Sequence, residues 1–100
     1  MIDGIVAGKI FGDPEKRKGK GDTPFVVAKV LAQTSEGETL IVNVIAFDDA
    51  PSSALLGLRE GDSVAVSGSL TPKVWTDKQG NTKPALDMVA QRVLAVQQGS

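Results

Sequence analysis

The chain has 100 residues with 11 basic and 12 acidic side chains, so its formal net charge is −1. This length suits one compact domain. Because the chain contains no Cys and no His, disulfides, thiolate metal sites and most designs for hydrolysis or zinc chemistry are excluded. We therefore expect no enzyme activity and no cofactor.

The apolar residues do not form a membrane segment. No apolar run exceeds four residues, and Met1-Ile2-Asp3 lacks the basic and apolar parts of an export signal. We expect a cytoplasmic protein without a membrane partner. The apolar content of 41% argues for a folded chain rather than a disordered one.

Hydrophobic side chains alternate with a period of two through most of the sequence, which predicts β-strands. The five predicted strands are about Asp3–Phe11, Pro24–Thr34, Thr39–Asp48, Ser63–Val74 and about Pro84–Val96. A loop rich in Gly and charge is expected at Gly12–Asp22, a short helix at Asp49–Leu58, and hairpin turns at Ser35–Glu38 and Asp77–Asn81.

This order of elements predicts the fold. Five strands with one short helix between strands 3 and 4 fit an all-β, five-stranded Greek-key barrel of the oligonucleotide/oligosaccharide-binding (OB) type. We expect a single OB-fold domain over residues 1–96 and a disordered C-terminal end over residues 97–100.

Seven of the eleven basic residues gather in two segments. The first contains Lys16, Arg17, Lys18 and Lys20, and the second contains Lys73, Lys78 and Lys83. In an OB-fold the loops that hold these segments flank the ligand, which crosses the second and third strands. The segments therefore predict contacts with phosphates along one basic stripe. The alternative is two solvated turns that contribute only solubility.

Two of the four aromatic residues occupy positions suited to stacking on bases. Phe47 shares a strand face with the polar residue Asn43, which indicates that this face is exposed to solvent. The alternative is that Phe47 occupies a core position. Trp75 stands among lysines near a hairpin turn, where an indole stacks on a base while ammonium groups neutralise phosphates. Its alternative role is to cover the open end of the barrel. Stacking and phosphate contacts together predict sequence-tolerant binding.

Four segments resemble the bacterial single-stranded DNA-binding protein family. They are Gly8–Arg17, Val44–Phe47, Leu58–Gly68 and Val74–Gly80. The resemblance covers about Ile2 to Val96. It implies the same barrel, stacking of Phe47 and Trp75 on bases, and assembly as a homodimer or homotetramer. It also implies that the protein coats single strands in DNA replication, repair and recombination.

Three features depart from the family's pattern. Ile41 stands where the family often has a further stacking Trp, and the connection Ala32–Glu38 is short and lacks an aromatic residue. The chain also ends at Gly99-Ser100 without an acidic, Phe-terminated tail, which is compatible with a trimmed end. We therefore expect one stacking platform fewer and no recruitment of repair partners through such a tail. In these departures the chain resembles primosomal replication protein N, a tail-less dimeric relative, and it equally resembles an accessory member of the family from a phage or mobile element.

We predict a non-enzymatic, sequence-tolerant single-stranded DNA-binding protein. We also expect it to assemble as a homodimer or homotetramer and to bind replication proteins. The predicted DNA-binding residues are Lys16, Arg17, Lys18, Lys20, Phe47, Lys73, Trp75, Lys78 and Lys83. A second hypothesis is a replication-restart factor that acts mainly as a protein-interaction module, since the net charge is near zero and aromatic residues are few. Catalysis by the adjacent Asp48 and Asp49 is a third hypothesis, but these residues are better suited to capping the predicted helix.

Overall fold

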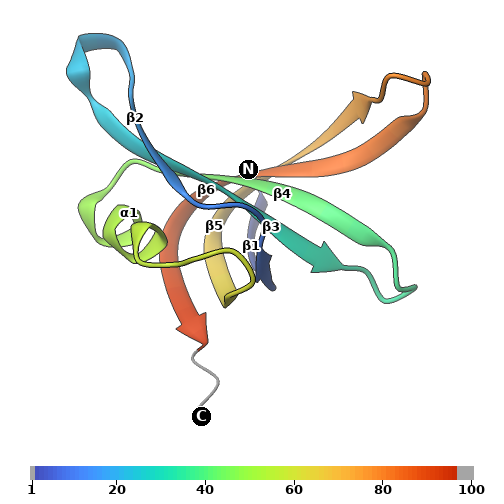
Figure 1. Cartoon of the computed structure of the whole chain (residues 1–100), viewed down its shortest axis with the longest axis horizontal. Coiled ribbons are helices and arrows are strands. Elements are labelled where there is room, and N and C mark those ends of the chain that lie inside the picture. Colours follow the sequence, from blue (N-terminus) through green and yellow to red (C-terminus); the bar gives the residue numbers. More distant parts are fainter. Residues whose placement is uncertain (1, 97–100) are drawn as a thin grey trace.

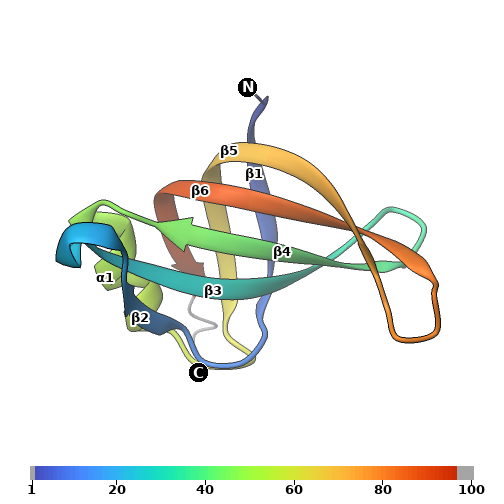
Figure 2. The ribbon, with the colours of Figure 1, turned by 90° about the horizontal axis from the view of Figure 1, so that it is seen from above.

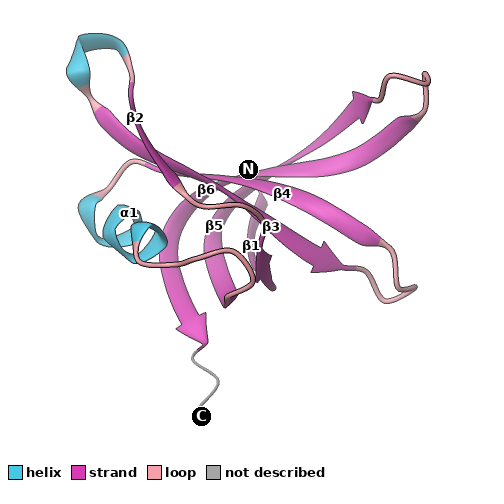
Figure 3. Cartoon of the chain, viewed as in Figure 1, coloured by secondary structure: helices cyan, strands magenta, loops and turns pink. Residues whose placement is uncertain are grey.

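The computed structural model describes residues 2–96, which form six strands, one α-helix and one short 3₁₀ turn (Figures 1 and 3). The elements are β1 (Ile2–Ile10), β2 (Glu15–Lys18), η1 (Lys20–Asp22), β3 (Pro24–Gln33), β4 (Thr39–Ala46), α1 (Asp49–Leu56), β5 (Ser63–Thr76) and β6 (Thr82–Val96). The end predicted to be disordered, residues 97–100, lies outside the described residues.

The strands close into a barrel. Their order in the sheet is β1-β5-β6-β4-β3-β2, and β1 also pairs with β3 through Lys9 opposite Leu31 and Ile10 opposite Val30. This last pairing closes a ring of five strands. The pairing of β4 with β6 is parallel, whereas the other described pairings are antiparallel. The predicted OB-fold barrel, with its helix between the third and fourth strands of the ring, is confirmed.

The prediction of a loop over Gly12–Asp22 is wrong in its middle part. Glu15–Lys18 form β2, which pairs antiparallel with Pro24–Val27 of β3. β1 and β2 therefore lie along one edge of β3, separated by a turn in which the Phe11 N–H donates to the Lys29 carbonyl at 2.9 Å. The edge of β3 needs hydrogen-bond partners beyond the point where β1 leaves it, and the backbone of β2 supplies them despite its charged side chains.

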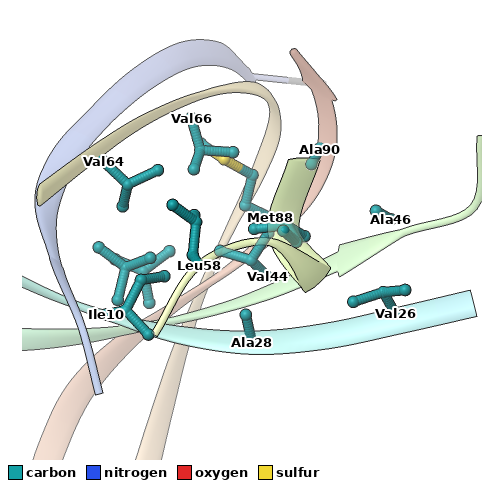
Figure 4. Packing of buried hydrophobic residues seen from close by; sticks show 13 residues of the cluster. Ile10, Val26, Ala28, Val44, Ala46, Leu58, Val64, Val66, Met88 and Ala90 are labelled. Carbon is teal, nitrogen blue, oxygen red and sulfur yellow. The ribbon is translucent and has the colours of Figure 1, made fainter. Parts of the chain in front are cut away.

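The core follows from the alternation within the strands (Figure 4). Val26, Ala28 and Val30 of β3 point inward and are buried, and residues 42, 44 and 46 of β4 do the same. Ile10, Val64, Val66 and Met88 fill the space between them. The outward residues of β3 and β4 are left to form a surface, as the sequence predicts for Asn43 and Phe47.

Helix α1 packs against the barrel through Pro51 and Leu55, both of which are buried. It ends at Gly57, whose N–H donates to the Ser53 carbonyl at 3.2 Å. Asp48 occupies the N-cap position, but its side chain forms no capping hydrogen bond, so the capping role expected of it is not present. Within residues 2–96, no helix is long and apolar enough to cross a membrane.

Two glycines allow strands to approach more closely than a side chain permits. A Cβ atom on Gly8 would overlap the Leu31 carbonyl oxygen, where β1 closes the barrel against β3. A Cβ atom on Gly68 would overlap the Val89 carbonyl oxygen, beside the register shift between β5 and β6. The closed ring therefore depends on the missing side chain at both positions.

Candidate nucleic-acid interface

A cleft of about 740 Å³ lies over the outer face of β3, β4, β6 and β5. The β2–β3 hairpin and the β5–β6 hairpin extend beyond the barrel on the same side of the molecule (Figure 1). Viewed from above, their tips lie at opposite ends of the surface formed by β3, β4 and β6 (Figure 2). The two basic segments found in the sequence therefore stand at the two ends of one surface.

The register of the strands determines which side chains form the floor of the cleft, because paired residues point to the same face of a sheet. One row across the four strands is polar: Lys29, Asn43, Asp87 and Thr71. The neighbouring row is mostly apolar: Val27, Ile45, Val89 and Ser69. All eight residues line the cleft. The floor thus combines apolar surface with a narrow band of hydrogen-bonding groups.

Asp87 is the centre of the polar row. Its Oδ1 accepts a hydrogen bond from Nδ2 of Asn43 at 3.3 Å, and its Oδ2 forms a salt bridge with Nζ of Lys73. The side chain of Asp87 is 33% exposed and that of Lys73 is 58% exposed. Lys73, which the sequence predicts as a phosphate contact, is therefore already paired with a carboxylate on the floor.

The basic residues of the first segment are divided between two faces of the β2–β3 hairpin. Arg17 is opposite Phe25 and lines the cleft, whereas Lys16 is opposite Val26 and points to the other face. Lys18 shares the face of Lys16, and Lys20 lies in the turn η1 at the tip. Arg17 is paired with Glu15 through an Nη2–Oε2 distance of 3.0 Å. Of the nine predicted residues, Arg17 is the one that lines the cleft itself.

An aromatic pair stands beside the cleft at the end of β4. Phe47 is 52% exposed, and its ring centroid lies 6.1 Å from that of Phe25 with the planes tilted by 47°. Phe47 is thus exposed, as the sequence predicts. Phe25 is absent from the predicted site, although its position on the outward face with Val27 and Lys29 is readable from the alternation along β3. Phe11 is 49% exposed and is the aromatic residue that lines the cleft itself, whereas Phe25 and Phe47 lie beside it.

Trp75 lies on the β5–β6 hairpin and is 41% exposed, so it is not enclosed in the core. It pairs in register with Lys83, whose Nζ is 5.6 Å from the centroid of its ring. This geometry is a cation–π contact. Lys78 is exposed in the turn between the strands. The hairpin therefore presents an aromatic ring together with two of the predicted cations.

Asp77 organises the turn of this hairpin. Its Oδ1 accepts hydrogen bonds from the backbone N–H groups of Asn81 at 2.8 Å and Gln79 at 2.9 Å. The hydrogen bond from the Asn81 backbone is the main cause that holds the pKa of Asp77 below its ordinary value of 3.8, and the Gln79 backbone and the charge of Lys83 act in the same direction. The carboxylate is therefore ionised at neutral pH and holds the turn that carries Lys78.

Acidic residues in the cleft are the feature that sequence reasoning missed. Asp13, Glu15 and Asp87 all line it. Their positions depend on the pairing of β2 with β3 and of β4 with β6, which no local pattern reveals. Among residues 2–96, no group of three or more acidic side chains is placed to hold a metal ion.

The comparisons with known proteins agree with this architecture. The model of the Single-strand binding protein family matches residues 1–96. A comparison with the sequences of curated proteins gives no significant match.

Three solved structures share the fold. The small single-stranded DNA-binding protein from Streptomyces coelicolor is 20% identical, with a TM-score of 0.75 over 95% of this chain and 94% of that one. The Plasmodium falciparum SSB in complex with ssDNA is 14% identical, with a TM-score of 0.68 and coverage of 97% and 96%. The mitochondrial protein Rim1 from S. cerevisiae is 18% identical, with a TM-score of 0.68 and coverage of 98% and 97%. At these identities the similarity establishes the fold.

Proposed function

Because the chain belongs to the Single-strand binding protein family, we propose that it binds single-stranded DNA across the cleft between its two basic hairpins. The observation that carries this proposal is the placement of an exposed aromatic side chain and several cations at each end of one surface. Phe47 packs against Phe25 at the end where the β2–β3 hairpin begins, and Trp75 lies on the β5–β6 hairpin at the other end. The complex of the P. falciparum protein with ssDNA supports the choice of ligand.

Binding of this kind needs no catalysis. Bases stack on Phe47 and Trp75, while the cations of the hairpins neutralise phosphates. These cations are Arg17, Lys20, Lys73, Lys78 and Lys83, whereas Lys16 and Lys18, also predicted from the sequence, lie on the other face of the β2–β3 hairpin. Each stacked base contributes about 1–3 kcal/mol, and each neutralised phosphate releases counterions. Since neither contact depends on base identity, the protein binds many sequences. Such binding serves to protect single strands during DNA replication, repair or recombination in the cytoplasm.

A salt titration tests the proposed function. Fluorescence of Trp75 should be quenched by single-stranded oligonucleotides, and the logarithm of the affinity should fall linearly with the logarithm of the salt concentration, with a slope of about −0.7 per phosphate contacted. Lys78→Gln should make that slope shallower by about one contact without changing the quenching at saturation. An unchanged fluorescence at low salt, or tighter binding to duplex than to single strands, would contradict the proposal.

We further propose that the protein assembles as a homodimer through β1. One edge of this strand pairs with β5, and within residues 2–96 its other edge pairs with β3 only at Lys9 and Ile10, so the backbone of residues 2–8 is a free edge there. Free edges pair readily with another strand. The midpoint of this edge is Ile5, which is 74% exposed. A two-fold axis at Ile5 would pair β1 with the β1 of a second copy and bury both isoleucine side chains together.

Ile5→Asp tests this assembly, because two carboxylates at the axis repel each other and lose the apolar contact. We expect light scattering to give the mass of a dimer for the unchanged protein and of a monomer for Ile5→Asp. Val74→Asp is the matched control, since Val74 is 72% exposed on the distant hairpin and should leave the mass unchanged. A monomeric mass for the unchanged protein would refute the assembly without affecting the proposed binding of DNA.

A further inference from the structure

We propose that Asp87 and Asn43 make the cleft prefer cytosine over thymine. This inference rests on the proposed function and concerns the base that meets the floor of the same cleft. Stacking and phosphate contacts do not depend on which base is bound, but hydrogen bonds to the side chains of the polar row do. A carboxylate and an amide lie side by side on β6 and β4, hydrogen-bonded to each other at 3.3 Å.

Asp87 offsets the charge of Lys29 in the same row, so the polar row holds no excess of positive charge that would attract phosphates. The cations Lys16, Lys18, Lys20 and Lys78 lie out on the hairpins. The apolar side chains Val27, Ile45 and Val89 beside Asp87 also favour bases over phosphates. The phosphates therefore follow the hairpins, and bases turn toward the polar row.

The polar row offers hydrogen-bond acceptors to such a base. Each carboxylate oxygen accepts more than one hydrogen bond, so Asp87 retains acceptor capacity beside its bonds to Asn43 and Lys73. Since Nδ2 of Asn43 donates to Asp87, Oδ1 of the same amide presents a further acceptor. The salt bridge with Lys73 and the bond from Asn43 together hold the carboxylate in position.

The two pyrimidines differ in what they present to these acceptors. Cytosine carries an exocyclic N4 amino group, which donates to a carboxylate. Thymine carries the O4 oxygen at the same place, and its single N3–H lies between two carbonyl oxygens that the carboxylate repels. Because stacking within the strand is the same whichever protein is added, a dC/dT difference that disappears in Asp87→Asn reports the hydrogen bonds rather than the flexibility of the strand.

The experiment compares the affinities of oligo-dC and oligo-dT of equal length for the intact protein and two variants. We expect the intact protein to bind oligo-dC on the order of tenfold more tightly than oligo-dT, as one hydrogen bond to a charged acceptor allows. Asp87→Asn should reduce this ratio to about one, since its amide also donates to O4 of thymine. Oligo-dU should behave as oligo-dT, which excludes an effect of the methyl group.

Glu15→Gln is the matched control. It removes the same charge from the same cleft, but Glu15 is paired with Arg17 on β2 and lies outside the polar row. We expect it to raise the affinity for both oligonucleotides and to leave their ratio unchanged. A cytosine oligonucleotide dimethylated at N4 gives the same test without any change to the protein, and it should bind as weakly as oligo-dT.

The outcomes separate the inference from the function on which it rests. A ratio that is the same in Asp87→Asn as in the intact protein, or an intact protein that prefers oligo-dT, would overturn the base preference alone. Tight binding of the dimethylated oligonucleotide would do the same. Failure of every oligonucleotide to bind would overturn the proposed function and this inference with it.

Discussion

Trp75→Ala is expected to weaken the binding of single-stranded DNA by about ten- to a hundredfold, since one stacked base is worth about 1–3 kcal/mol. The indole is exposed on the β5–β6 hairpin and lies outside the core, so the substitution removes a contact surface without removing core packing. Lys83, which stands over the ring, also loses its cation–π partner. Anisotropy of a labelled oligonucleotide measures the loss, because the variant has no other tryptophan.

Val74→Ala provides the control for this prediction. Val74 is the neighbouring residue on the same strand, is 72% exposed and points to the opposite face. Its truncation should leave the affinity within about twofold of the intact protein. Phe47→Ala should cost less than Trp75→Ala, because the ring of Phe25 remains beside it to receive a base. Equal affinities for Trp75→Ala and Val74→Ala would show that the hairpin does not stack on DNA.

Gly68→Ala is expected to destabilise the fold by roughly 3 kcal/mol. The added Cβ atom would overlap the carbonyl oxygen of Val89, which belongs to the backbone and has no alternative rotamer. Strands β5 and β6 would have to separate at the register shift where Gly68 pairs with Ala90. Urea unfolding measures the loss as a lower midpoint at an unchanged slope.

Gly57→Ala is the matched control for the effect of adding a methyl group to glycine. Gly57 has a φ of −80° at the end of α1, and an added Cβ atom would lie 3.6 Å from the Ala54 carbonyl oxygen, an ordinary contact distance. We expect its stability to change by less than about 1 kcal/mol in either direction. A loss for Gly68→Ala no larger than that for Gly57→Ala would contradict the close approach of β5 and β6.

The barrel could be predicted from the sequence because its signals are local. The alternation in residues 40–47 separates a buried face from an exposed one, and the leucines after Pro51 give the helix that covers the core. β2 could not be predicted in this way, since Glu15–Lys18 carry only charged side chains. These residues form a strand because the edge of β3 at Pro24–Val27 requires hydrogen-bonding partners. That edge lies further along the chain, so no local pattern in Glu15–Lys18 reveals it.

The exposed aromatic residues of the candidate site could be predicted from the sequence, whereas the salt bridges in the cleft could not. The positions of Phe47 and Trp75 follow from the order of the strands, and both are exposed as expected. The salt bridges of Lys73 with Asp87 and of Arg17 with Glu15 were not predictable, because a list of basic residues does not show which acids lie beside them. The structure therefore replaces the predicted basic stripe with a cleft that has basic hairpins at its two ends and a floor of apolar and mixed polar side chains.

Chemical-shift mapping of the backbone amides with a single-stranded oligonucleotide tests the central claim most directly. Binding across the cleft predicts the largest changes at Lys29, Asn43 and Val89 on the floor and at Trp75 on the hairpin, with small changes along the β1 residues Asp3 and Ile5. Changes that gather on β1 while the floor stays unaffected would contradict it and would place the DNA on another face of the barrel.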